Sequence, residues 1–198
     1  MRPTEILSAE HRVIESVLDC LEVLAEEARR GKGPDVEQAR AVLEFLRTFA
    51  DRWHHGKEED RLFPMLVARG MPAHAGPIAV MLDDHRAGRE LVRRMGEPRE
   101  VADAEGFAAA AQGFVALLRD HIAREDHVLF PMAESMLDSA GREALRASFV
   151  AFERDAPEPD TSARMRRLAD DLARRHGVPL ASARSAPRST TPGPFPFS

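Results

Sequence analysis

The chain of 198 residues is 43% hydrophobic and 31% charged, with a formal net charge of −5 at pH 7. This composition suffices for a core of ordinary domain size, and no apolar run approaches the roughly 20 residues of a membrane-spanning helix. Residues 160–198 carry seven Arg and three Asp, so the acidic remainder holds a charge of −9, which argues against nucleic-acid binding. Cys20 is the single cysteine and the start has no apolar signal segment, so we expect a cytoplasmic protein.

Breaks rich in glycine and proline divide the chain into stretches of good helix formers. Apolar residues at helical spacing predict helices over about 4–30, 35–68, 77–95, 103–136, 140–154 and 161–176. The first four are long and joined by short links, which is typical of an all-α, up-down four-helix bundle. We expect the bundle to span residues 1–156. In the C-terminal extension, residues 157–198, the amphipathic helix 161–176 should be followed after Val178 by a disordered tail rich in Pro and Ser.

Two segments of the chain repeat one pattern 67 residues apart, namely HHGKEEDRLFPM (54–65) and HIAREDHVLFPM (121–132). Both contain a histidine, a glutamate four residues later, and the ending Leu-Phe-Pro-Met. On a helix, a spacing of four residues places two side chains on one face, about one turn apart. The residues that the repeat predicts to face the interior are His54, Glu58, His121 and Glu125.

His55 and Glu59 begin a second register in the first copy, about 100° around the helix from the first. The second copy has Ile122 and Asp126 at these positions, so it keeps no histidine in this register. We therefore place His55 and Glu59 on the flank of the predicted site. His55 either orients or supplements a ligand there, or is exposed.

Two further histidines lie on the apolar faces of the remaining long helices. His11 is in line with Ile14 and Leu18, and His85 is in line with Val92. A lone histidine on such a face is usually a core residue, but four histidines and two glutamates would converge here. Two buried carboxylates without partners cost several kcal/mol each, and metal cations offset that cost. Imidazole together with carboxylate suits iron, manganese or zinc.

The motifs EHRVIE, HHGKEEDRLFP, DDHRAGRE and HIAREDHVLFP resemble those of the hemerythrin-like, or HHE cation-binding, domains. The resemblance covers about residues 4–136. It implies a four-helix bundle that holds two non-haem iron ions with an oxo or hydroxo bridge. The ligands that it implies are terminal His11, His54, His85 and His121, and bridging Glu58 and Glu125, which is the four-histidine subtype.

One position departs from the oxygen-carrying members of the family. Those proteins use a fifth histidine one turn from the histidine of the third helix, where this chain has Met81. The soft sulfur of Met81 matches ferric iron poorly, so we expect it to fill the core. The second carboxylate of hemerythrins lies five residues after its histidine, which corresponds to Asp126. Asp126 and Glu59 are therefore candidates for additional ligands.

Without a fifth histidine, both irons would keep open positions for small ligands. The first hypothesis is a diiron protein that binds or senses O₂, NO or peroxide, or handles iron. The second is an enzyme that disproportionates peroxide or reduces NO, and the third is a metal-free helical interaction module. We expect a small ligand as the partner, without nucleic acid or membrane, while the oligomeric state stays open.

Overall fold

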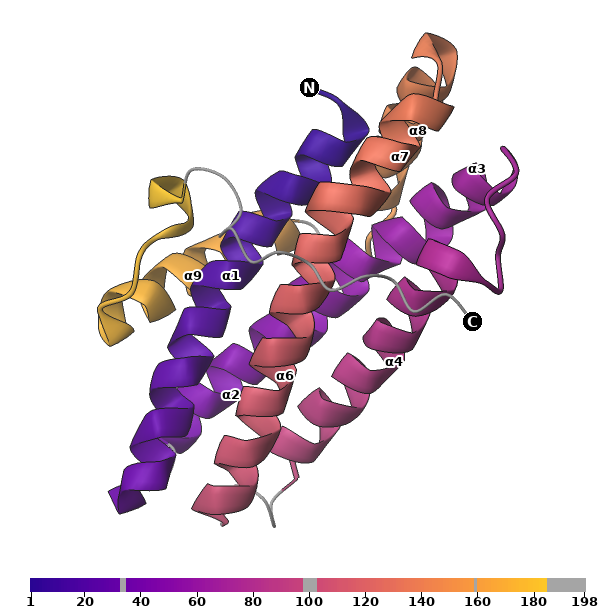
Figure 1. The fold of residues 1–198 in the computed structure, drawn as a ribbon. Coiled ribbons are helices and arrows are strands. Elements are labelled where there is room, and N and C mark those ends of the chain that lie inside the picture. The colour runs from indigo at the N-terminus through magenta and orange to yellow at the C-terminus, as the bar shows by residue number, and fades with distance from the viewer. Residues whose placement is uncertain (33–34, 98–102, 159, 185–198) are drawn as a thin grey trace.

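The structure, a computed structural model, describes residues 1–32, 35–97, 103–158 and 160–184. All regular elements in these ranges are helical. Four long helical segments run up and down beside one another, and two further helices pack at the side of this bundle (Figure 1). The predicted all-α bundle with an additional C-terminal helix is therefore confirmed.

Several of the long segments of the bundle change their winding along their length, and the first one has a kink at Gly31 (φ 76°). Stretches labelled η2, η3 and η4 are π-helical, with more residues per turn than an α-helix. The four segments are α1 (Pro3–Glu27) with η1 (Ala28–Lys32); α2 (Val36–Phe45), η2 (Leu46–His55), η3 (Glu58–Leu62) and α3 (Phe63–Val67); α4 (Gly76–Met95); and α6 (Ala104–Arg124), η4 (Glu125–Leu129) and α7 (Phe130–Met136).

Sequence signals explain where these helices begin. Asp35 caps α2 by accepting hydrogen bonds from the backbone amides of Glu37 (3.0 Å) and Gln38 (3.1 Å). Asp103 caps α6 in the same way through the amide of Glu105 (3.2 Å). Proline occupies the first turn of α4, where its missing amide hydrogen removes no helical bond.

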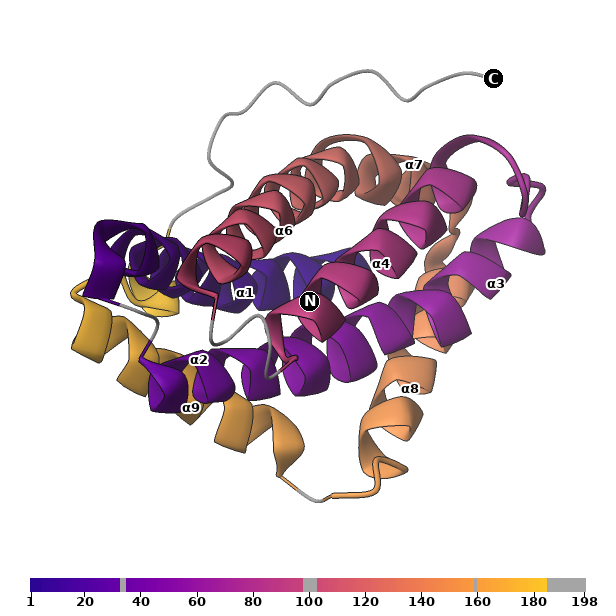
Figure 2. The same ribbon diagram turned by 90° about the horizontal axis from the view of Figure 1, so that it is seen from below.

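The C-terminal part of the chain covers the bundle. It contains α8 (Ser139–Arg154), α9 (Thr161–His176) and the short 3₁₀ turn η5 (Ala181–Ala183). In Figure 2, α9 lies along α1 and α2, which it also contacts, and α8 crosses the far end of the α2–α3 segment.

The prediction of disorder directly after Val178 is wrong for residues 179–184. The hydroxyl of Ser16 donates to the carbonyl of Pro179 (2.8 Å), and Arg184 is paired with Asp19 and largely buried. The hydrogen bond from Ser16 and the ion pair with Asp19 thus hold this segment against α1, and Ala181 packs against the core of the bundle. Residues 185–198 of the predicted tail lie outside the described residues.

Two apolar clusters fill the bundle, one toward each end. The larger cluster includes Ile14 and Leu18 of α1, and the smaller one includes Leu7 of the same helix. His11 therefore lies between the two clusters, in a polar layer across the bundle. No helix in the described ranges combines the length and hydropathy needed to cross a bilayer.

Candidate metal centre

Five histidines and two glutamates meet in the polar layer. They come from all four long segments of the bundle, and none has more than 6% of its surface exposed. Six of them are the residues that the sequence predicted to face the interior. The complete set is His11, His54, His55, Glu58, His85, His121 and Glu125.

The two glutamates lie at the middle of this cluster. Glu125 accepts from Nε2 of His11 (3.1 Å), and its Oε2 is 3.3 Å from Nε2 of His121. Glu58 lies between the other two rings: its Oε1 is 3.5 Å from Nε2 of His54, and its Oε2 is 3.6 Å from Nε2 of His85.

Donor atoms of the cluster form two groups in which all atoms lie within 4.8 Å of one another. The spacing is short enough for one metal ion to contact every donor of a group. Glu58 belongs to both groups, so its carboxylate can bridge two ions. The groups are His11, His54, Glu58 and Glu125, and His55, Glu58, His85 and His121.

His55 is a member of the cluster, which excludes the exposed alternative for this residue. Its ring stacks on that of His85, with centroids 3.8 Å apart and planes 14° apart. Both ring nitrogens are buried without a hydrogen-bond partner among the described residues. The π-helical winding of η2 puts more residues in each turn, so adjacent side chains diverge less around the axis than in an α-helix. His54 and His55 can therefore both face the interior.

Each of the four histidines of the motif has a carboxylate at its Nδ1. Because an ionised carboxylate only accepts, Nδ1 carries a proton and Nε2 faces the centre, where it can bind a metal ion once it carries no proton. Such partners fix the orientation of a metal-binding imidazole and raise its basicity. The pairs are His11 with Asp126 (3.0 Å), His54 with Glu10 (3.0 Å), His85 with Glu59 (2.6 Å) and His121 with Asp84 (3.3 Å).

Asp126 and Glu59 thus occupy a different place from the additional ligands that the sequence suggested. Neither belongs to the two donor groups, since each points at the outer nitrogen of a histidine. Arg12 also pairs with Asp126, and Arg89 with Glu59 (2.7 Å). Met81 lies outside both groups and is fully buried in the smaller apolar cluster, as expected for a core residue.

Sequence reasoning missed Glu10, Asp84 and Lys57. Glu10 is almost fully buried and accepts from Nε1 of Trp53 (3.1 Å) and from the buried ammonium of Lys57. A signal for the two acids was present, because Glu10 directly precedes His11 and Asp84 directly precedes the histidine of α4. The acid beside a histidine on one helix orients the histidine of another helix.

A model of the hemerythrin HHE cation binding domain matches residues 2–133, which is more than half of the chain. The chain belongs to the hemerythrin HHE family. Its cluster of histidines and glutamates fits the four-histidine pattern of that family and can hold metal cations. Comparisons with curated proteins and with solved structures gave no significant match.

The buried carboxylates and the unpaired polar atoms of this HHE domain favour bound cations. Burial and the neighbouring Glu125 hold the pKa of Glu58 well above its usual range. Burial lowers the pKa of His54 to about 3, against the opposing effect of Glu10. Both oxygens of Glu58 and Nε2 of His54 are buried without hydrogen-bond partners among the described residues. Metal cations would satisfy these atoms, so the residues fit the ions that the family binds.

Phenylalanines of the two LFP motifs cover the centre on one side. Phe130 stacks on His11 (centroids 5.4 Å apart), and Phe63 stacks on His85 (6.0 Å). The prolines that follow do not end their helices. Pro64 and Pro131 occupy the first turns of α3 and α7, directly after the π-helical stretches. The two LFP motifs thus place one phenylalanine against a histidine of each donor group.

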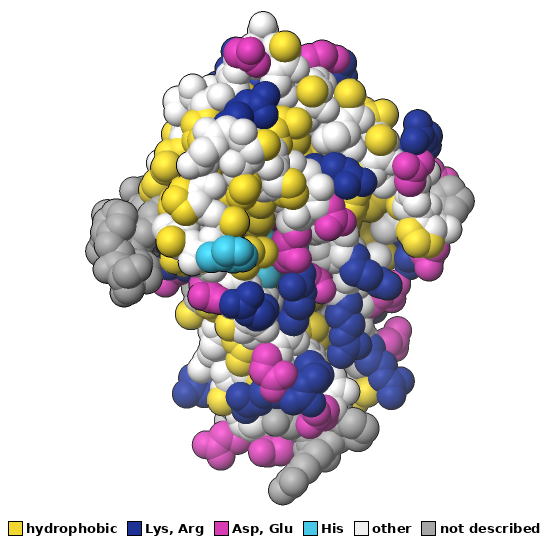
Figure 3. Space-filling model, turned by 90° about the vertical axis from the view of Figure 1, so that its right-hand side faces the viewer, with side chains coloured by type: hydrophobic (Ala, Val, Ile, Leu, Met, Phe, Trp, Pro, Cys, Tyr) yellow, Lys and Arg dark blue, Asp and Glu magenta, His cyan; other side chains and the backbone are white. Residues whose placement is uncertain are grey.

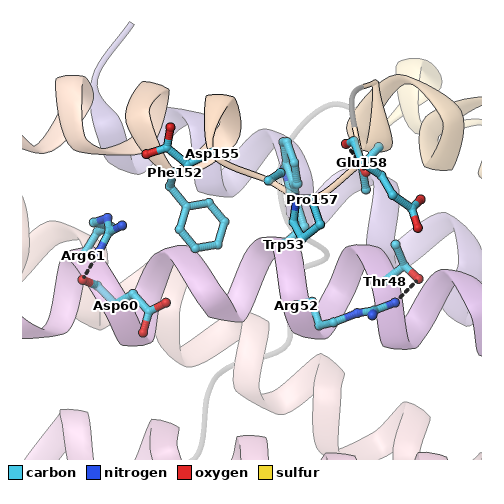
Figure 4. A pocket seen from close by; sticks show the side chains of 11 residues that line it. Thr48, Arg52, Trp53, Asp60, Arg61, Phe152, Asp155, Pro157 and Glu158 are labelled. Atoms are coloured by element: carbon cyan, nitrogen blue, oxygen red, sulfur yellow. Dashed lines mark hydrogen bonds between the residues drawn. The ribbon is translucent and has the colours of Figure 1, made fainter.

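Behind His54, the indole of Trp53 lines a surface cavity of about 340 Å³ between η2 and the link from α8 to α9. Figure 4 shows Phe152 of α8 and Pro157 of that link lying over the cavity. Trp53 thus lies between this cavity and Glu10, which in turn holds His54.

Proposed function

We propose that the chain is a non-haem diiron protein that binds a small ligand such as O₂, NO or peroxide. The observation that carries this proposal is the position of Glu58. Its Oε1 faces His54 of one donor group, and its Oε2 faces His85 of the other. One ion would be held by the first group and the second ion by the other, with the carboxylate of Glu58 between them.

The donor set supports iron over other metals. Each group contains at least two histidines and one carboxylate, and this combination is typical of non-haem Fe(II) sites. Zinc prefers four tetrahedral ligands in a site of its own, whereas here the two groups share a carboxylate. Manganese and zinc remain the competing ions that metal analysis distinguishes.

When bound, the two ions supply Lewis-acid and redox chemistry toward a small ligand. The protein holds the histidine rings with Nε2 inward, through the carboxylates of Glu10, Glu59, Asp84 and Asp126. The phenylalanines of the LFP motifs exclude water from one side. These residues give a fixed donor geometry in an apolar surrounding.

His55 bears on the choice between a binding protein and an enzyme. The oxygen-carrying members that the sequence resembles use a fifth histidine from the third helix, whereas this chain supplies a fifth imidazole from η2. A fifth imidazole leaves fewer open positions than four would. This favours binding or sensing of a small ligand, and a catalase-like or NO-reducing activity is the alternative.

Iron content and the absorption spectrum test the proposal. We expect about two irons per chain, from the two donor groups, and a charge-transfer band of an oxo-bridged pair. The double variant His54→Ala with His121→Ala should lose both. If this variant binds iron as the wild type does, the centre is misplaced, and if the wild type binds none, the helical-module hypothesis stands. Oxygen release from added peroxide above the level of free iron would establish the enzyme alternative.

A further inference from the structure

A second cavity of about 340 Å³ lies between η2, α4 and α6. Its lining includes the rings of His55 and His85, which belong to the same donor group. This volume is about ten times the share of one water molecule in the liquid and is typical of small-molecule sites. The cavity therefore connects the candidate metal centre with a space large enough for an incoming ligand.

The inner wall of this cavity is apolar. Val92 of α4 and Phe114 and Leu118 of α6 line it, and each has at most 7% of its surface exposed. Gly88 completes the wall on α4 and leaves space where any other residue would place a side chain. A Cβ atom added at Gly88 would meet the ring of Phe114 at 3.5 Å, which is ordinary van der Waals contact.

Two of the three arginines that line the cavity, Arg47, Arg89 and Arg93, are paired with acidic residues. Arg89 donates to Asp51 (2.7 Å) and to Glu59 (2.7 Å), and Arg93 is paired with Glu90 (2.6 Å). Figure 3 views the molecule from the side of α4, where arginine and acidic side chains lie next to one another across the surface. Cations that are already neutralised attract an anion only weakly.

At the inner end, His55 offers an unsatisfied polar group. Its ring is more than nine-tenths buried, lines the cavity, and has no hydrogen-bond partner at either nitrogen among the described residues. Nδ1 of His55 is 3.7 Å from Asp51, which is too long for a hydrogen bond. The imidazole is thus free to bind a metal ion or a molecule that arrives through the cavity.

We propose that this cavity is the route by which small uncharged molecules reach the His55–His85 side of the centre. The inference rests on the proposed function, because the destination is the metal pair. The apolar wall admits neutral molecules such as dioxygen, nitric oxide or a peroxide in its protonated form. An anion would lose hydration against this apolar wall, and the paired Arg89 and Arg93 at the rim offset that loss only weakly.

Filling the wall tests the route. In Gly88→Leu the new side chain occupies the cavity. Nitric oxide binding to the anaerobic, iron(II)-loaded full chain should then slow by about tenfold in both association and dissociation, with a nearly unchanged Kd. An equal effect on both rates is expected of a narrowed route, since the bound state itself is untouched. Gly113→Leu is the matched control: position 113 is also a helical glycine with room for a Cβ, on α6, and it does not line the cavity.

Xenon provides a readout that needs no metal, because apolar cavities bind it. Xenon should occupy the cavity of the metal-free wild type and of Gly113→Leu, and should be excluded from Gly88→Leu. If the leucine variant fails to fold, Gly88→Ala takes its place. It adds only a methyl group in ordinary contact and should give an intermediate rate of nitric oxide binding. Wild-type nitric oxide rates in a Gly88 variant that loads iron normally and excludes xenon would overturn the route. Absence of iron from the wild type would instead refute the diiron proposal.

Discussion

Glu10 accepts a hydrogen bond from Nδ1 of His54 at 3.0 Å, although the two residues lie on different helices and 44 positions apart. The carboxylate is buried and shares the ammonium of Lys57, which is itself fully buried and also donates to Glu153 (2.9 Å). Glu10 therefore has two functions: it fixes the ring of a candidate metal ligand, and it neutralises a buried cation.

Replacing Glu10 with glutamine should affect both functions. The amide keeps the shape but loses the charge, so among the described residues Lys57 retains only Glu153 as an ionic partner. Removing one partner of a buried pair costs about 3–5 kcal/mol, which denaturant unfolding of the metal-free protein would measure. Loss of an orienting carboxylate should also weaken iron binding by about 10- to 100-fold in chelator competition. Glu90→Gln, at an exposed position of α4, is the control, and equal behaviour of the two variants would contradict this role.

Substitution by glutamine should affect the stability of the metal-free protein differently at Glu58 and at Glu125. Burial raises the pKa of Glu58, so the folded state disfavours its charge, and Glu58→Gln should leave stability at pH 7 unchanged or increased. Despite burial, His121 and His11 hold the pKa of Glu125 well below its usual range. Glu125→Gln removes that ionised partner and should lower the free energy of unfolding by about 1–3 kcal/mol.

Both glutamine variants should nevertheless lose the iron pair, since each removes a carboxylate donor. Thermal or denaturant unfolding of metal-free samples separates the two effects from metal binding. Equal destabilisation by the two substitutions would show that Glu58 is ionised and paired in the folded, metal-free protein.

His55 should act as a ligand although the repeat does not preserve it. His55→Ala removes one of three imidazoles from its donor group, so we expect iron occupancy on that side to fall and the absorption spectrum to change. The apolar contacts of the site are little affected, because the ring lies at the edge of the cavity beside Asp51. His127→Ala, on the exposed face of η4, is the matched control. Two irons with a wild-type spectrum in His55→Ala would eliminate it as a ligand.

Metal binding should release protons near neutral pH. Burial alone would lower the pKa of His11, but Asp126 and Glu125 raise it to about 9. The ring is therefore protonated at pH 7 in the metal-free protein, and an ion must displace that proton. Apparent Fe(II) affinity should rise with pH up to about 9 for this group. Anaerobic calorimetry in buffers of different ionisation enthalpy would detect proton release, and buffer-independent heats would contradict it.

The raised pKa of His11 also makes the stability of the metal-free protein depend on pH. Because the folded pKa of His11 lies above its ordinary value, its stabilising contribution is complete below pH 6.5 and is lost as the pH rises through about 9. Asp126→Asn should reduce this alkaline loss, since it removes the carboxylate that most raises the pKa. Unfolding curves of both proteins between pH 6 and 10 would measure the difference.

Much of this protein follows from the sequence by itself. Apolar spacing, aspartate caps and breaks at glycine and proline determined the long helices, because these signals act within a few residues. The repeated His-x-x-x-Glu placed His54 with Glu58, and His121 with Glu125, on interior faces, since a spacing of four residues is one turn of a helix. The structure brings these residues together with His11 and His85.

Only the tertiary structure decided what surrounds those residues. The π-helical winding of η2 turns His55 inward. A prediction based on the α-helical period misses this orientation. Glu59 and Asp126 face the outer nitrogens of histidines on other helices, and Glu10 reaches His54 in the same way. Periodicity along one helix shows which side chains share a face. Which donor meets which acceptor depends on how neighbouring helices pack, and that is a property of the folded bundle alone.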